Sequence, residues 1–152
     1  MDQLVFYFAL MLLASIPWIE ASFAVPIAIL TGANPVISFI VGMFGNIVTL
    51  LLAVVFASQI KEWLNKRKRT KSTKRVTNTF EKYGLVGAAL LGPILLGSHI
   101  VAIIAISMNI PKWQTFIYVS LGTALWAIVL SVLVQFGIDL FGLENMRLLD
   151  GA

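Results

Sequence analysis

The sequence predicts an all-α integral membrane protein of two inverted repeats, each a re-entrant helical hairpin followed by one transmembrane helix, with an additional N-terminal helix. Three observations lead to this fold class. Of the 152 residues, 59% are hydrophobic and 12% are charged, whereas a soluble domain carries about a quarter charged residues. Two uncharged stretches are long enough to cross a membrane as helices. Two further apolar stretches are interrupted by proline and glycine, which break helices.

The first half of the single membrane domain (residues 1–152) covers residues 1–57. A hydrocarbon core of roughly 30 Å needs about 20 helical residues, and the stretch 35–57 meets this requirement. Upstream, Pro17 and Pro26 flank Glu20. We therefore expect a hairpin over residues 17–34, preceded by the additional N-terminal helix and followed by the span 35–57.

The second half, residues 83–138, has the same order of elements. Its interrupted stretch, 83–110, contains Gly92, Pro93 and Gly97, and we expect a hairpin there. The stretch 113–138 is the second span, and residues 139–152 form a tail. A shift of the chain by 76 residues aligns Pro17 with Pro93. Interrupted segments at matching places in two halves are typical of transporter binding sites.

An alternative topology treats the interrupted stretches as full spans. Residues 4–30 and 83–109 would then be kinked helices in a bundle of four transmembrane helices, with both chain ends on the same side. The two topologies place the tail on opposite sides of the membrane, and the sequence leaves the choice open.

Residues 58–82 form a predicted basic loop. Nine of the eleven lysine and arginine residues fall between Lys61 and Lys82. Such an excess holds a loop in the cytoplasm, so the protein is expected in the cell (inner or plasma) membrane, with lipids as partners and no nucleic acid. The cations expected to meet lipid headgroups are Lys66, Arg67, Lys68, Arg69, Lys71, Lys74 and Arg75.

Glu20 is the only acid within the apolar stretches, and His99 is the only histidine. Acids inside membrane segments are functional candidates by default, and histidine changes its charge near neutral pH. Hairpins that meet tip to tip would bring the two together. We expect Glu20 and His99 to bind protons or substrate, with Ser22, Asn46 and Ser98 lining the cavity. The alternative readings are an interfacial Glu20 and a His99 that only ties helices together.

Catalysis and metal binding are not expected. Ser98 and His99 are adjacent, so on a helix their side chains diverge and cannot act as a nucleophile and its base. One histidine and one acid supply too few metal ligands. The sequence therefore predicts no enzyme, no metal and no cofactor.

Several spaced residues resemble a known family. They are Pro17-Trp-Ile-Glu20, Pro26, Gly32, Gly45-Asn46, Phe80-Glu-Lys-Tyr-Gly84, Gly92-Pro93, Gly97-Ser98-His99, Gly122 and Trp126. This pattern, over roughly residues 16–130, resembles the putative small multidrug export protein family and, more distantly, the DedA membrane proteins. The first resemblance implies export. The second implies re-entrant hairpins and a proton-coupled carrier of lipid phosphates with arginines in the second hairpin, where this chain has only His99.

We therefore expect a multi-pass, proton-coupled transporter of a cationic or lipophilic compound or of a lipid phosphate, assembled as a homodimer or larger homo-oligomer. The alternative is a membrane scaffold or assembly subunit that transports nothing, in which the breaks serve packing and the loop recruits lipid. The sequence leaves open the substrate, the coupling ion and the number of subunits.

Overall fold

The computed structural model describes residues 2–67 and 74–141, without the side chains of 64–67, 74–83, 85 and 141. Within these ranges the chain is helical and has no strand. Its helices are α1 (Gln3–Ala14), α2 (Glu20–Leu30), α3 (Pro35–Arg67), α4 (Lys74–Leu95), α5 (Ser98–Ser107) and α6 (Lys112–Phe141). The all-helical part of the predicted fold class is confirmed.

Two of the helices are long and apolar enough to cross a membrane. They cover Pro35–Trp63 in α3 and Lys112–Leu140 in α6. The first turn of α3 is held by Asn34, whose Oδ1 accepts hydrogen bonds from the backbone N–H of Val36 (3.0 Å) and Ile37 (3.1 Å). An asparagine here satisfies donors that the helix itself leaves unpaired.

Both helices beside the basic segment extend further than predicted. The sequence placed a loop at residues 58–82, but α3 continues to Arg67 and α4 begins at Lys74. Lysine, arginine and glutamate are good helix formers, so charge alone does not end a helix that leaves the apolar region. The side chains predicted to meet lipid headgroups, Lys66 to Arg75, lie outside the described side chains.

The sequence placed a hairpin over residues 17–34. In the structure the first turn of the chain lies earlier, at residues 15–19 between α1 and α2, and α2 then runs unbroken through Pro26. Pro17 falls in this turn, where its ring prevents α1 from continuing. Pro26 is buried inside α2, where packing against neighbouring helices keeps a proline-containing helix intact.

The second turn lies at Leu96–Gly97. Gly97 is one of the three residues at which a break was expected, whereas the other two, Gly92 and Pro93, lie inside α4, which continues to Leu95. Pro93 leaves the Ala89 carbonyl without its helical donor, and that carbonyl packs closely against Gly122 of α6. The neighbouring Leu90 carbonyl accepts a hydrogen bond from the Trp126 indole N–H. Contacts from α6 thus support the helix across its proline.

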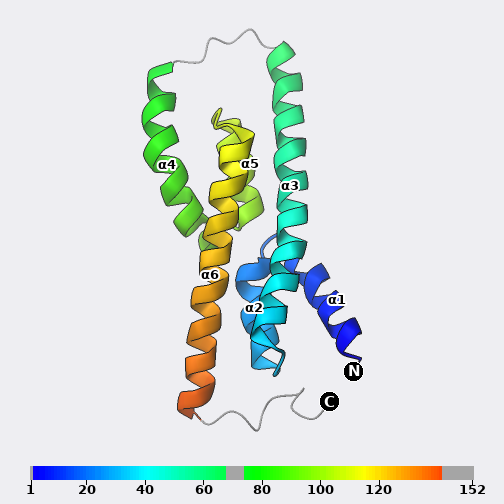
Figure 1. Ribbon diagram of the computed structural model, residues 1–152. Helices are drawn as coiled ribbons and strands as arrows, with labels where there is room; N and C mark the ends of the chain where they lie inside the picture. The colour runs from blue at the N-terminus through cyan, green and yellow to red at the C-terminus, as the bar shows by residue number, and fades with distance from the viewer. Residues whose placement is uncertain (1, 68–73, 142–152) are drawn as a thin grey trace.

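The short helices occupy opposite halves of the molecule. Figure 1 shows α3 and α6 running in opposite directions, with α1 and α2 beside the first half of α3 and α4 and α5 beside its second half. In the pair α1–α2 and in the pair α4–α5 the chain turns back near the middle of the molecule (Figure 1). α1 has 12 residues and α2 has 11, which gives lengths of about 18 and 17 Å.

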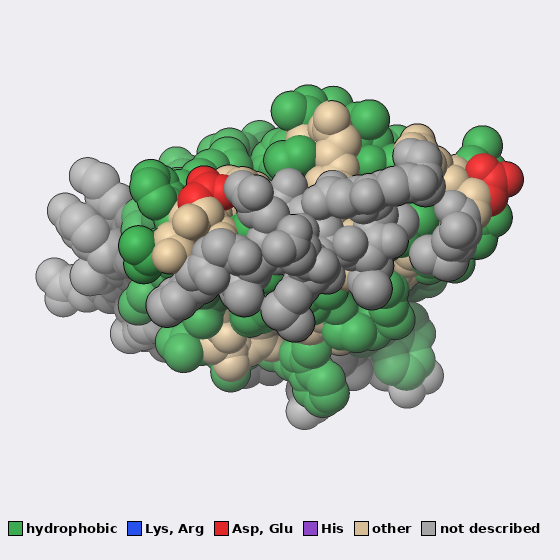
Figure 2. All heavy atoms as spheres, turned by 90° about the horizontal axis from the view of Figure 1, so that it is seen from below, with side chains coloured by type: hydrophobic (Ala, Val, Ile, Leu, Met, Phe, Trp, Pro, Cys, Tyr) green, Lys and Arg blue, Asp and Glu red, His purple; other side chains and the backbone are tan. Residues whose placement is uncertain are grey.

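Two apolar clusters form the interior. One joins α1, α2 and α3 around Ala14, Ala21 and Val25, and the other joins α3, α5 and α6 around Leu50, Ala102 and Val119. The outside is also apolar, and Figure 2 shows hydrophobic side chains over most of its coloured surface. Leu4 and Leu140 are 76% and 80% exposed. A surface of this kind suits lipid, and the molecule is a membrane protein.

Candidate functional site: a buried glutamate–histidine pair

Glu20 stands at the first position of α2, directly after the turn at residues 15–19. Its side chain is fully buried although it carries an ionisable group. The backbone of the turn is unusual, since Trp18 has φ 85° and Glu20 has φ 41°. Positive φ values are uncommon for residues with a side chain, and here they turn the carboxyl group into the interior.

The second turn meets the first at this point. Gly97, with φ 86° and ψ 144°, precedes α5. A Cβ atom on Gly97 would lie 3.2 Å from both Glu20 Oε1 and Trp18 Cδ1. Only glycine adopts this backbone conformation readily, and its missing side chain also leaves room for the carboxylate. The two turns are therefore in direct contact.

One carboxylate oxygen of Glu20 binds the start of α5. Oε1 accepts hydrogen bonds from Ser98 Oγ (2.9 Å) and from the His99 backbone N–H (3.4 Å), and it lies 3.1 Å from His99 Nδ1. A helix N-terminus favours negative charge because its N–H groups are unpaired and the helix dipole is positive there. Within the described part of the chain, Oε2 has no hydrogen-bond partner.

Thr49 of α3 holds the other side of the imidazole. Its Oγ1 lies 3.1 Å from His99 Nε2, and also 3.1 Å from both the Gly45 and the Asn46 carbonyl oxygens. Donation of the one hydroxyl proton to either carbonyl leaves Oγ1 to accept a hydrogen bond from Nε2–H. Thr49 was not among the site residues expected from the sequence; its position three residues after Asn46, on the same helix face, is the signal that was available.

The structure thus brings together Glu20, Ser98 and His99 at the place where the two turns meet. Ser22 and Asn46 are buried but make no hydrogen bond to this cluster among the described residues. Asn46 Nδ2 instead donates to the Ala14 carbonyl (3.4 Å), which ties α3 to α1. Ser22 Oγ and Asn46 Oδ1 have no partner within the described ranges.

Comparison with family models gives one match over this region. The model described as putative small multi-drug export protein matches residues 20–129, which include Glu20, Thr49 and His99. The description is that of an exporter, not an enzyme. Comparisons with curated proteins and with solved structures give no match. The more distant resemblance to DedA proteins stays a prediction. Since the match covers most of the chain, this membrane protein belongs to the putative small multi-drug export protein family.

Proposed function

We propose that the chain is a proton-coupled exporter whose proton site is the Glu20–His99 pair. The observation that carries the proposal is a fully buried carboxyl group held between two turns, with one oxygen on Ser98 and His99 and the other without a partner among the described residues. An ionised carboxylate is costly in an apolar interior, and intramembrane acids commonly serve as proton relays. The imidazole of His99 lies beside it and can accept or return that proton.

The hydrogen bonds around the His99 imidazole leave one position for an exchangeable proton. Since Thr49 accepts from Nε2–H, the remaining position is the contact between His99 Nδ1 and Glu20 Oε1. One proton there belongs either to an imidazolium beside a carboxylate or to a carboxylic acid beside a neutral imidazole. Both arrangements are neutral overall, which is the favoured condition for an enclosed pair in low dielectric.

Loss of this proton leaves one negative charge in the interior. A cation about 4 Å away would offset it by about 4 kcal/mol at an effective dielectric constant of 20. Binding of a cation and release of the proton are then linked, and the two exchange across the membrane. Lys61, the described cation on α3, lies 12 residues beyond Thr49, about 18 Å along the helix. The pair therefore fits a lipophilic cation better than a lipid phosphate.

The transport cycle we propose uses α1–α2 and α4–α5 as re-entrant pairs that enter from opposite sides. The lengths of α1, α2 and α5, which have 12, 11 and 10 residues, the short apolar part of α4 (Val86–Leu95) and the central turns support this. A shift of the chain by 77 residues, one more than the shift that aligns Pro17 with Pro93, also supports the two re-entrant pairs. It relates two pairs of positive-φ residues, Glu20 with Gly97 and Gly32 with Asn109. Glu20 is enclosed in this conformation, and movement of one pair relative to the other would open it to either side in turn.

A proteoliposome experiment tests the proton site. Uptake of tetraphenylphosphonium, a lipophilic cation, is driven by a pH gradient and compared among the wild type, Glu20→Gln and Glu62→Gln. Glutamine keeps the shape of glutamate but cannot exchange a proton. Glu62 is an exposed acid on α3 and serves as the matched control. We expect Glu20→Gln to lower the gradient-driven rate at least about 10-fold, because the variant loses the exchangeable proton and also a hydrogen bond to a charged group, which contributes about 1.5–3 kcal/mol.

Two outcomes would contradict the proposal. Equal rates for the wild type and Glu20→Gln would remove Glu20 from proton coupling. Absence of tetraphenylphosphonium uptake, together with gradient-driven transport of a short-chain lipid phosphate, would overturn the assignment of a cationic substrate.

A further inference from the structure

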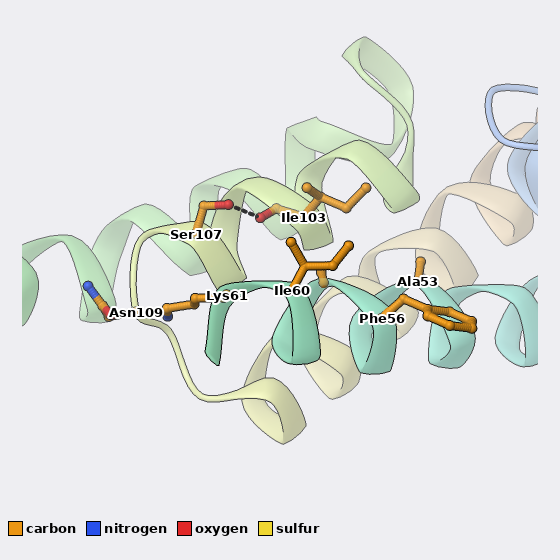
Figure 3. A pocket seen from close by; sticks show the side chains of 8 residues that line it. Ala53, Phe56, Ile60, Lys61, Ile103, Ser107 and Asn109 are labelled. Atoms are coloured by element: carbon orange, nitrogen blue, oxygen red, sulfur yellow. Dashed lines mark hydrogen bonds between the residues drawn. The ribbon is translucent and has the colours of Figure 1, made fainter. Parts of the chain in front are cut away.

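A cavity of about 450 Å³ lies between α3 and α5, and neither member of the glutamate–histidine pair lines it. Its polar lining residues are Lys61, Ser107 and Asn109, and its apolar ones include Phe56, Ile60 and Ile103. Figure 3 shows Lys61 and Asn109 at one end and Phe56 at the other, with Ile60 between. The cavity is therefore polar at one end and apolar along its length.

The apolar part of this cavity faces outward. Phe56 and Ile60 are each 59% exposed, and Ile103 is 46% exposed. These side chains lie on the surface that meets hydrocarbon in a membrane, so an acyl chain fits along them. The polar end follows the last apolar turn of α3, since Lys61 is the first charged residue after Pro35. This order matches the junction between hydrocarbon and headgroups.

The polar end carries a positive charge and a free amide. Lys61 Nζ donates one hydrogen bond to the Ile106 carbonyl near the end of α5, and an ammonium group has two further N–H donors. The end of a helix corresponds to about half a negative charge, so roughly half a positive charge remains. Within the described part of the chain, the side-chain amide of Asn109 has no hydrogen-bond partner, and its φ of 70° fixes it beyond the end of α5.

We propose that this cavity binds one anionic membrane phospholipid. Its phosphate receives hydrogen bonds from Lys61 and Asn109, and one acyl chain lies against Ile60, Phe56 and Ile103. The proposal does not rest on proton coupling, because neither Glu20 nor His99 lines the cavity. Lys61 bridges α3 and α5, so a bound lipid would also strengthen the contact between these two helices.

Native mass spectrometry of the full chain in detergent micelles tests the headgroup contact. The bound fraction is measured with phosphatidylglycerol and with phosphatidylcholine of the same acyl chains, for the wild type and two variants. Lys61→Gln keeps an N–H donor for the Ile106 carbonyl but removes the charge. Lys112→Gln is the matched control, since Lys112 is an exposed cation that does not line the cavity. We expect Lys61→Gln to weaken phosphatidylglycerol binding about fivefold, from about 1 kcal/mol per cation near a membrane surface.

The controls distinguish a built site from general attraction of charges. Lys112→Gln should bind phosphatidylglycerol as the wild type does, and Lys61→Gln should leave phosphatidylcholine binding unchanged. Ala53→Phe, which places a ring in the apolar part of the cavity, should weaken phosphatidylglycerol binding without loss of helix content by circular dichroism. The proposal is overturned if Lys61→Gln binds phosphatidylglycerol like the wild type, or if Lys112→Gln loses as much binding as Lys61→Gln.

Discussion

Replacement of Gly97 by alanine tests the contact between the two turns on which the site depends. Gly97 has φ 86° and ψ 144°, close to a backbone region in which residues with a side chain are strained by about 1–3 kcal/mol. The added methyl group would also lie 3.2 Å from Glu20 Oε1 and Trp18 Cδ1, so both must shift by a few tenths of an ångström. We expect Gly97→Ala to lower the free energy of unfolding by about 1–3 kcal/mol.

Gly87→Ala is the matched control for this measurement. Gly87 lies inside α4, and a methyl group there would meet nothing within 4 Å. Alanine in a helix interior is favoured over glycine by about 0.5–1 kcal/mol, so this variant should be slightly more stable than the wild type. The two variants should therefore differ by about 1.5–4 kcal/mol.

The assay is equilibrium unfolding in mixed micelles, followed by circular dichroism. Gradient-driven transport should fall in Gly97→Ala, because the methyl group displaces the carboxylate, and should persist in Gly87→Ala. Equal unfolding free energies for the two variants, or a Gly97→Ala protein more stable than the wild type, would refute the described contact between the turns.

Two further predictions concern the long helices. Gly122→Ala should lower the unfolding free energy by about 1–3 kcal/mol, because its methyl group would clash with the Ala89 carbonyl. The control is Gly137→Ala on the same helix, whose methyl group would meet nothing within 4 Å and should not lower it. Equal stabilities of the two variants in thermal unfolding would contradict the close contact of α4 with α6. Thr49→Val removes the acceptor of His99 Nε2–H and leaves a buried donor unpaired, at about 1–3 kcal/mol, so gradient-driven transport should fall about 10-fold while Thr49→Ser stays near the wild type. Because His99 is the only histidine, nitrogen-15 NMR of the labelled imidazole reports its tautomer directly, and identical spectra for Thr49→Val and the wild type would argue against this role.

Features that depend on a single segment of the chain were predicted well from the sequence. The apolar composition of α3 and α6 was sufficient to identify two spanning helices, because crossing a membrane depends mainly on the length and hydropathy of one segment. Glu20 and His99 also stood out without coordinates, since ionisable groups are rare in such stretches.

The turns and the third member of the site were predicted less well. Proline marked both interrupted stretches correctly, yet α2 and α4 continue through Pro26 and Pro93. A proline breaks a helix only when no neighbour supports the freed backbone, and at Pro93 that neighbour is α6, which is distant in sequence. Thr49 was missed because its one sequence signal, a position three residues after Asn46 on the same helix face, is equally typical of residues that pack between helices.

The sequence by itself determined that this is a helical membrane protein with two long apolar helices, two interrupted stretches and one acid within them, because each of these is a property of a single continuous segment. Only the tertiary structure decided where the chain turns back and which side chains meet. Glu20, Thr49 and His99 come from three different helices. Their contacts depend on how those helices pack, and packing is decided by complementary surfaces of the whole chain rather than by local preference.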